Sequence, residues 1–195
     1  MTETTRATFL ARGAKGGLAL VAGGSLLALA EGTALGAATT DADIAKLAAT
    51  AELLAIDFYS KAISSKRLSG AELAYLHAAR DNERAHYRAL AGVLGMAAPK
   101  NLRFAYPKGA FASARSIGSL GQALETAFVG AYLGAVTALR SNELKGVAAT
   151  IGANESRHLS VLSNIAAGTI VAAPSFPKAL TAAQATAAVK PFLAA

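Results

Sequence analysis

The chain has 195 residues with 19 basic and 12 acidic side chains, which gives a formal net charge of +7. It lacks cysteine and tryptophan, so no disulfide framework supports the fold, and thiolate sites for copper(I) or iron-sulfur clusters are disfavoured. Helix formers such as alanine and leucine dominate, and strand-like alternations of valine and isoleucine are missing, so we expect an all-α protein.

Residues 1–36 have the order of a signal peptide. Arg6, Arg12 and Lys15 precede an apolar run over residues 16–30, and small residues follow it. The run has about fifteen residues, fewer than the roughly twenty that cross a bilayer comfortably. We therefore expect a protein exported to the periplasm or another place outside the cytoplasm. If the segment is not removed, it would serve as an N-terminal membrane anchor.

The sequence does not identify the pathway by which the protein would be exported. Residues 5–10 resemble a twin-arginine signal, including the pair Phe9-Leu10, but Ala7 stands where the second arginine belongs. The segment therefore predicts export without fixing the route.

Four long helices are predicted beyond this segment. Thr39, Thr40 or Asp41 caps the first helix, and a capping box of Ser69 with Glu72 starts the second. The helices span about residues 41–64, 70–94, 119–139 and 142–167.

A long crossover joins the second and third helices. Residues 96–117 contain Pro99, Pro107 and Gly109, which makes them too irregular for a helix but long enough to return along a bundle. The two flanking helices then run parallel, so residues 37–170 are expected to form a four-helix bundle with one long crossover.

Residues 171–195 form a separate tail. A proline-containing link over 174–177 leads to a short helix that begins near Thr181 and ends before Pro191. We expect this tail to pack on the bundle or to contact another subunit in a homo-oligomer.

A Glu-x-x-His motif occurs twice, in the second and fourth helices. A glutamate and a histidine three residues apart share one helix face and can hold one cation. A lone glutamate precedes each copy by about thirty residues, and four such helices supply the inward-facing ligands of a di-metal carboxylate bundle. The six candidate metal ligands are Glu52, Glu83, His86, Glu125, Glu155 and His158.

The predicted turns place these ligands at one depth. Two antiparallel helices bring together residues that are equidistant from their loop. The first two glutamates are centred on the polar turn at 66–70, and the second two on the turn at 140–142. Each glutamate lies about 20 Å from its turn, in the middle of the bundle.

The other acidic residues and histidine have simpler interpretations. Beyond residue 36 the remaining glutamates are Glu72 and Glu143, which lie near helix starts and suit the helix dipole. His77 falls on the side of its helix opposite His86, so a surface or interhelix position is expected. A metal-free polar core is the alternative, but burying these carboxylates without cations would be costly.

A tyrosine follows each lone glutamate by seven residues. Tyr59 and Tyr132 therefore share the ligand face, and each phenol can lean back and donate a hydrogen bond to a ligand carboxylate. The alternative role is aromatic core filling. Asp57 has no counterpart in the second half and is expected at the helix edge.

Residues 40–168 resemble the ferritin-like superfamily of di-iron and di-manganese carboxylate proteins, on the combined pattern of Glu, Glu-x-x-His, Glu and Glu-x-x-His. The exported ferritin-like domain proteins are the nearest group within it. The resemblance implies two iron or manganese ions bridged by Glu83 and Glu155. Glu52 with His86 would complete one ion, and Glu125 with His158 the other.

The flanks of the motif depart from the family pattern. Many members carry an aspartate before the motif glutamate that accepts a hydrogen bond from a ligating histidine, whereas this chain has Asn82 and Asn154. The amide oxygen can still accept that bond, but two negative charges near the ions are lost. Arg157 matches the family arginine before the histidine, and Arg84 is displaced by one residue.

Four carboxylates and two imidazoles suit iron or manganese. The leading hypothesis is an oxidoreductase of ferroxidase-like or manganese-catalase-like type that consumes oxygen or peroxide in stress protection. The alternatives are a non-enzymatic metal-binding or interaction bundle at the envelope, and iron storage. The scattered basic residues predict no nucleic-acid partner.

Overall fold

The computed structural model describes residues 39–169 and 174–194, so the predicted signal segment 1–36 lies outside the described residues. The described chain is helical, with one isolated bridge between Phe104 and Leu193 in place of a sheet. The α-helices are α3 (Asp41–Ser64), α4 (Gly70–Leu94), α5 (Ala114–Ala138), α6 (Asn142–Ala167) and α7 (Ala182–Val189), with short 3-10 helices η1 (Gly95–Ala97) and η2 (Lys190–Phe192).

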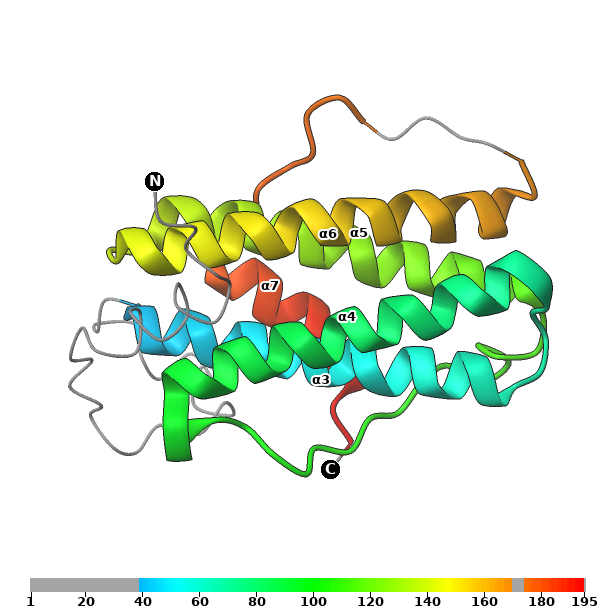
Figure 1. Cartoon of the computed structure of the whole chain (residues 1–195), viewed down its shortest axis with the longest axis horizontal. Coiled ribbons are helices and arrows are strands. Elements are labelled where there is room, and N and C mark those ends of the chain that lie inside the picture. The colour runs from blue at the N-terminus through cyan, green and yellow to red at the C-terminus, as the bar shows by residue number, and fades with distance from the viewer. Residues whose placement is uncertain (1–38, 170–173, 195) are drawn as a thin grey trace, which may run out of the picture.

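The four long helices form the predicted bundle with one crossover (Figure 1). α3 and α4 make one antiparallel hairpin, and α5 and α6 make the other. The crossover leaves η1 and runs the length of the bundle before α5 begins, so α4 and α5 are parallel (Figure 1). α7 packs against α3 and α5. The all-α bundle predicted from the sequence is confirmed.

Helix α5 begins at Ala114, five residues before the predicted start, so the prediction of an irregular segment up to residue 117 was wrong at its end. Ser113 and Ser116 form a capping box that starts the helix there. Gly118 and Gly121 are buried inside α5, where neighbouring helices approach closely.

The predicted capping box at the start of α4 was also wrong. Ser69 is the cap residue and has an extended backbone, but its side chain makes no capping hydrogen bond. At the start of α3 a capping box does form, between Thr40 and Asp43. Of the three predicted candidates for this cap, Thr39, Thr40 and Asp41, the structure therefore selects Thr40.

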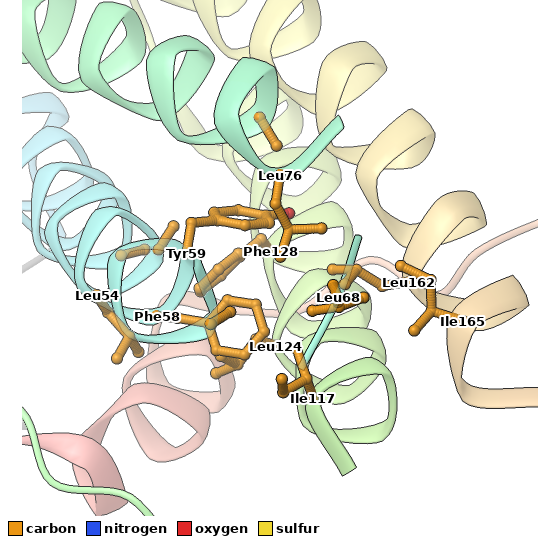
Figure 2. Close-up of a cluster of buried hydrophobic side chains, with 14 of the residues drawn as sticks. Leu54, Phe58, Tyr59, Leu68, Leu76, Ile117, Leu124, Phe128, Leu162 and Ile165 are labelled. Carbon is orange, nitrogen blue, oxygen red and sulfur yellow. The ribbon is translucent and has the colours of Figure 1, made fainter. Parts of the chain in front are cut away.

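Two apolar clusters fill the bundle core on either side of its middle. The first draws side chains from all four long helices, including Leu54, Phe58, Leu76 and Leu162 (Figure 2). The second fills the other half of the bundle and includes Leu90, Leu94, Leu139 and Ile151. The polar residues of the bundle interior fall between these clusters.

Among the helices of residues 39–169 and 174–194, none is both long enough and apolar enough to cross a bilayer.

Replacing Gly118 with alanine is expected to destabilise the bundle. A methyl group there would lie 2.5 Å from the backbone nitrogen of Ala166, so α5 and α6 would have to separate. We expect a loss of about 1–3 kcal/mol in the free energy of unfolding, measured by denaturant titration.

The matched control is Gly92→Ala on α4, where a methyl group would meet no atom within 4 Å. There, alanine should stabilise the helix by about 0.5–1 kcal/mol. Equal effects of the two substitutions would contradict the close approach of α5 to α6 at Gly118.

Candidate metal centre

The six predicted ligands meet in the middle of the bundle, between the two apolar clusters. Each long helix contributes at this level: α3 and α5 one glutamate each, α4 and α6 a glutamate and a histidine. The four glutamates and His158 are all buried to 2% exposure or less. The side chain of His86 is 13% exposed, which makes its edge the open side of the site.

The donor atoms form two overlapping groups. One group contains Glu52, Glu83, His86 and Glu155, and its donor atoms lie within 4.8 Å of one another. The second group meets the same criterion and replaces Glu52 and His86 with Glu125 and His158. Because Glu83 and Glu155 belong to both groups, the geometry suits two neighbouring cations that share two carboxylates.

His86 turns its Nδ1 atom toward the carboxylates. This atom lies 2.9 Å from Glu83 Oε2, 3.0 Å from Glu155 Oε1 and 3.3 Å from Glu52 Oε2. It thus approaches glutamates of three different helices. These are the three glutamates with which it is grouped.

His158 presents the same atom to the second group. Its Nδ1 lies 2.7 Å from Glu83 Oε1, 3.2 Å from Glu155 Oε2 and 3.9 Å from Glu125 Oε1. The two halves of the site are therefore near copies of each other, as the repeated motif predicts.

Several carboxylate oxygens of the site have no hydrogen-bond partner. Glu83 Oε1, Glu125 Oε2 and Glu155 Oε1 are buried and unpaired among the described residues. The histidine Nδ1 atoms approach two of them closely, but not with the alignment of a hydrogen bond. Unpaired buried carboxylate oxygens are costly, and a cation would satisfy them. The residues present therefore fit a di-metal group.

A family model described as a ferritin-like domain matches residues 40–168. The chain belongs to the ferritin-like domain family. The matched range covers α3 to α6 and all six grouped residues. Comparison with curated proteins gives no match to this chain.

Two tyrosines of the ferritin-like domain donate hydrogen bonds across the bundle. Tyr59 on α3 donates to Glu125 Oε1 on α5, at 2.5 Å. Tyr132 on α5 donates in return to Glu52 Oε1 on α3. Each phenol thus holds the lone glutamate of the opposite helix. Both tyrosines are also part of the apolar clusters, so the two roles considered for them coexist.

The two asparagines before the motif glutamates place their side-chain amides beside the histidines. Asn82 Nδ2 lies 3.3 Å from His158 Nε2 on the opposite helix, whereas Asn154 Nδ2 lies between the two rings, 3.2 Å from His158 Nε2 and 3.4 Å from His86 Nε2. Arg157 donates to Asn154 Oδ1, which turns the amide nitrogen toward the imidazoles. Acceptance of a histidine proton by an amide oxygen stays a prediction. A proton on each histidine belongs at Nδ1, among the carboxylates.

Burial and hydrogen bonding push the carboxyl pKa values apart. Burial raises the pKa of Glu52 and of Glu125 well above the ordinary range. Burial would raise that of Glu83 too, but the close imidazoles of His158 and His86 lower the pKa of Glu83 to about 2. Without cations, Glu83 therefore loses its proton far more readily than Glu52 and Glu125 do.

The histidine pKa values move in the opposite direction from what burial alone would cause. Burial would lower them, but the facing carboxylates raise the pKa of His86 to about 12 and that of His158 to about 9. Each histidine therefore carries a proton at Nδ1 at neutral pH in the absence of cations, and this proton occupies the position of a metal.

Tyr75 lies beside the site and was not predicted from the sequence. Tyr75 on α4 packs edge-on against His158 with ring centroids 6.0 Å apart. Burial and the nearby Glu125 raise the pKa of Tyr75 to about 12. It lies eight residues before Glu83, about two helical turns, so the same spacing argument that found the other tyrosines could have found it.

The residues predicted to lie outside the site do so. His77 is exposed, with Nδ1 3.5 Å from an Arg80 nitrogen. Asp57 is half-buried at the helix edge, bound to Lys61 at 2.6 Å and accepting from Tyr106 at 2.8 Å. Asp57 therefore anchors the crossover to α3.

Cation binding to this ferritin-like site is expected to release protons. The Nδ1 protons of the histidines and the carboxyl protons of Glu52 and Glu125 must leave, on the order of two to four per chain. Because the pKa values of His86 and His158 are raised to about 12 and about 9, their protons are bound at neutral pH, and affinity should increase from about pH 6 to about pH 9. The raised carboxyl pKa values of Glu52 and Glu125 act in the same direction. Chelator competition at several pH values measures this. An affinity that does not change with pH would contradict the assigned protonation.

Removing the phenol of Tyr59 should weaken cation binding. In Tyr59→Phe the Glu125 carboxylate loses the donor that orients it, and losses of about 10–100-fold in metal affinity are typical of such partners. Tyr87→Phe is the control, because Tyr87 donates to the carbonyl of Pro99 outside the site. Equal affinities for Mn(II), measured by calorimetry, would show that the phenol has no role in orienting the ligand.

Proposed function

We propose that this ferritin-like chain is an exported di-metal protein that uses iron or manganese to react with oxygen or hydrogen peroxide. The observation that supports it most strongly is the pair of overlapping donor groups sharing Glu83 and Glu155. The buried, unpaired oxygens of these glutamates would be stabilised by cations bound between the four helices.

The donor set favours iron or manganese. Carboxylates with one imidazole per group make a mixed oxygen and nitrogen shell, and the chain has no thiolate to attract softer metals. When bound, a carboxylate-bridged pair of either metal can exchange electrons with oxygen or peroxide by changing between divalent and trivalent states.

The protein around the donors supports a reaction with small molecules. Apolar clusters close the site above and below, and Tyr59 and Tyr132 hold the lone glutamates in place. The exposed edge of His86 is the open side among the ligands, with 13% of its side chain accessible. Such a site favours substrates of the size of oxygen or peroxide.

The predicted export would place this chemistry outside the cytoplasm, in a protective role. The basic, apolar and small-residue order of residues 1–36 is that of a signal peptide. We propose that the mature bundle removes oxidants or oxidisable iron in the cell envelope, as part of a stress response.

Rapid mixing of the iron- or manganese-loaded protein with peroxide or oxygen tests this function. We expect oxidant consumption with a matching change in the absorption spectrum. In Glu83→Gln the shared charge is lost, and the rate should fall by at least about 100-fold. Glu72→Gln is the control, because Glu72 is exposed near the start of α4. A fully loaded site that reacts with neither oxidant would refute the proposal.

A structural metal site is the second candidate. The amides of Asn82 and Asn154 place neutral groups next to the histidines, where a carboxylate would tune reactivity. A structural site should raise the melting temperature steeply on metal binding, with no spectral response to oxidants. Comparing melting curves of the metal-free and loaded protein with the mixing experiment separates the two candidates.

A further inference from the structure

A cavity of about 360 Å³ lies on the face of the bundle between α3 and α5, beneath α7. It shares no residue with the six grouped glutamates and histidines. Most of its lining residues are apolar, and three are threonines. Thr137 Oγ1 donates to the carbonyl of Gly134, and Thr181 Oγ1 accepts from the N–H of Gln184. The apolar wall includes Ile44, Leu47, Phe128 and Val189. The hydroxyl-bearing residues are Thr39, Thr137 and Thr181.

The cavity is elongated. Its wall follows α3 from Thr39 to Ala51 and the antiparallel α5 from Ala138 back to Ala127. Twelve residues of helix extend about 18 Å. A lining that follows two helices over that length suits an extended hydrocarbon chain better than a compact group of fused rings.

The space is maintained by small residues in the wall. Alanines at 48, 51, 131, 135 and 185 face the cavity, where larger apolar residues would fill it. The cavity is partly open to the surface and has a volume of about 360 Å³. Cavities of this class commonly bind small molecules.

The roof of the cavity is fixed by backbone contact. The N–H of Leu180 donates to the carbonyl of Gly130 at 2.8 Å. A methyl group at Gly134 would lie 1.7 Å from the carbonyl oxygen of Leu180, so only glycine admits this segment. α7 continues from there and packs on both α3 and α5 (Figure 1).

We propose that this cavity binds a linear aliphatic chain, such as the acyl chain of a fatty acid, with its polar end at the threonine hydroxyls. Tyr132 is part of the wall and donates to Glu52, so one aromatic ring separates the bound chain from the carboxylates. The proposal does not rest on the di-metal function, because no grouped ligand lines the cavity.

Binding of saturated fatty acids of about eight to sixteen carbons to the full chain tests the proposal, measured by calorimetry below their micelle concentrations. Each methylene buried in an apolar site improves affinity about fourfold. We therefore expect Kd to fall with chain length until the cavity is full and then to level off. Absence of binding across the series, or tighter binding of a fused-ring compound of similar volume, would overturn the proposal.

Variants locate the binding site. Ala131→Leu places a larger side chain in the middle of the cavity, and it should weaken binding of the longest acids at least tenfold and shift the plateau to shorter chains. Ala149→Leu is the matched control, on the exposed face of α6. Melting curves establish that each variant folds, and Ala185→Leu on α7 gives a second blocking variant. Unchanged affinity in both blocking variants would refute the assigned site.

Discussion

Four buried glutamates at one level of a helical bundle are the constraint on which the rest of this structure depends. Carboxylates of this kind are strongly destabilising without partners, and each of the neighbouring features reduces that cost. Histidines on α4 and α6 place Nδ1 atoms among the oxygens, and phenols from α3 and α5 hold the lone glutamates. Oxygens of Glu83, Glu125 and Glu155 still have no hydrogen-bond partner, and bound cations would offset the remaining cost of burying them.

The partners of the site are exchanged between its two halves. Tyr59 donates a hydrogen bond to the glutamate of the opposite half, and Tyr132 does the same in return. Asn82 faces the histidine of the other motif helix, and Asn154 lies between both histidines. Displacing one helix would therefore disturb both halves together. The halves still differ, because Arg157 holds Asn154 whereas Arg84 pairs with Asp81 at the surface, and because His86 is the more exposed histidine.

The sequence predicted the bundle and the meeting of the six grouped residues because helical geometry converts spacing directly into position. Glu83 and His86 share a face whatever surrounds them, and a short turn fixes which residues lie opposite each other. The remaining features depend on contacts between helices. The close approach of α6 to Gly118 and the turning of the Asn154 amide by Arg157 are two such contacts. The apolar cavity requires the position of α7, which spacing along α3 and α5 does not reveal.

The central claim is that this ferritin-like bundle holds two cations between four helices. Anaerobic titration of the metal-free protein with Fe(II) or Mn(II), followed by gel filtration and elemental analysis, measures it most directly. The two overlapping donor groups predict two retained ions per chain. A protein that retains neither metal would contradict the account and would leave the buried glutamates as a metal-free polar core.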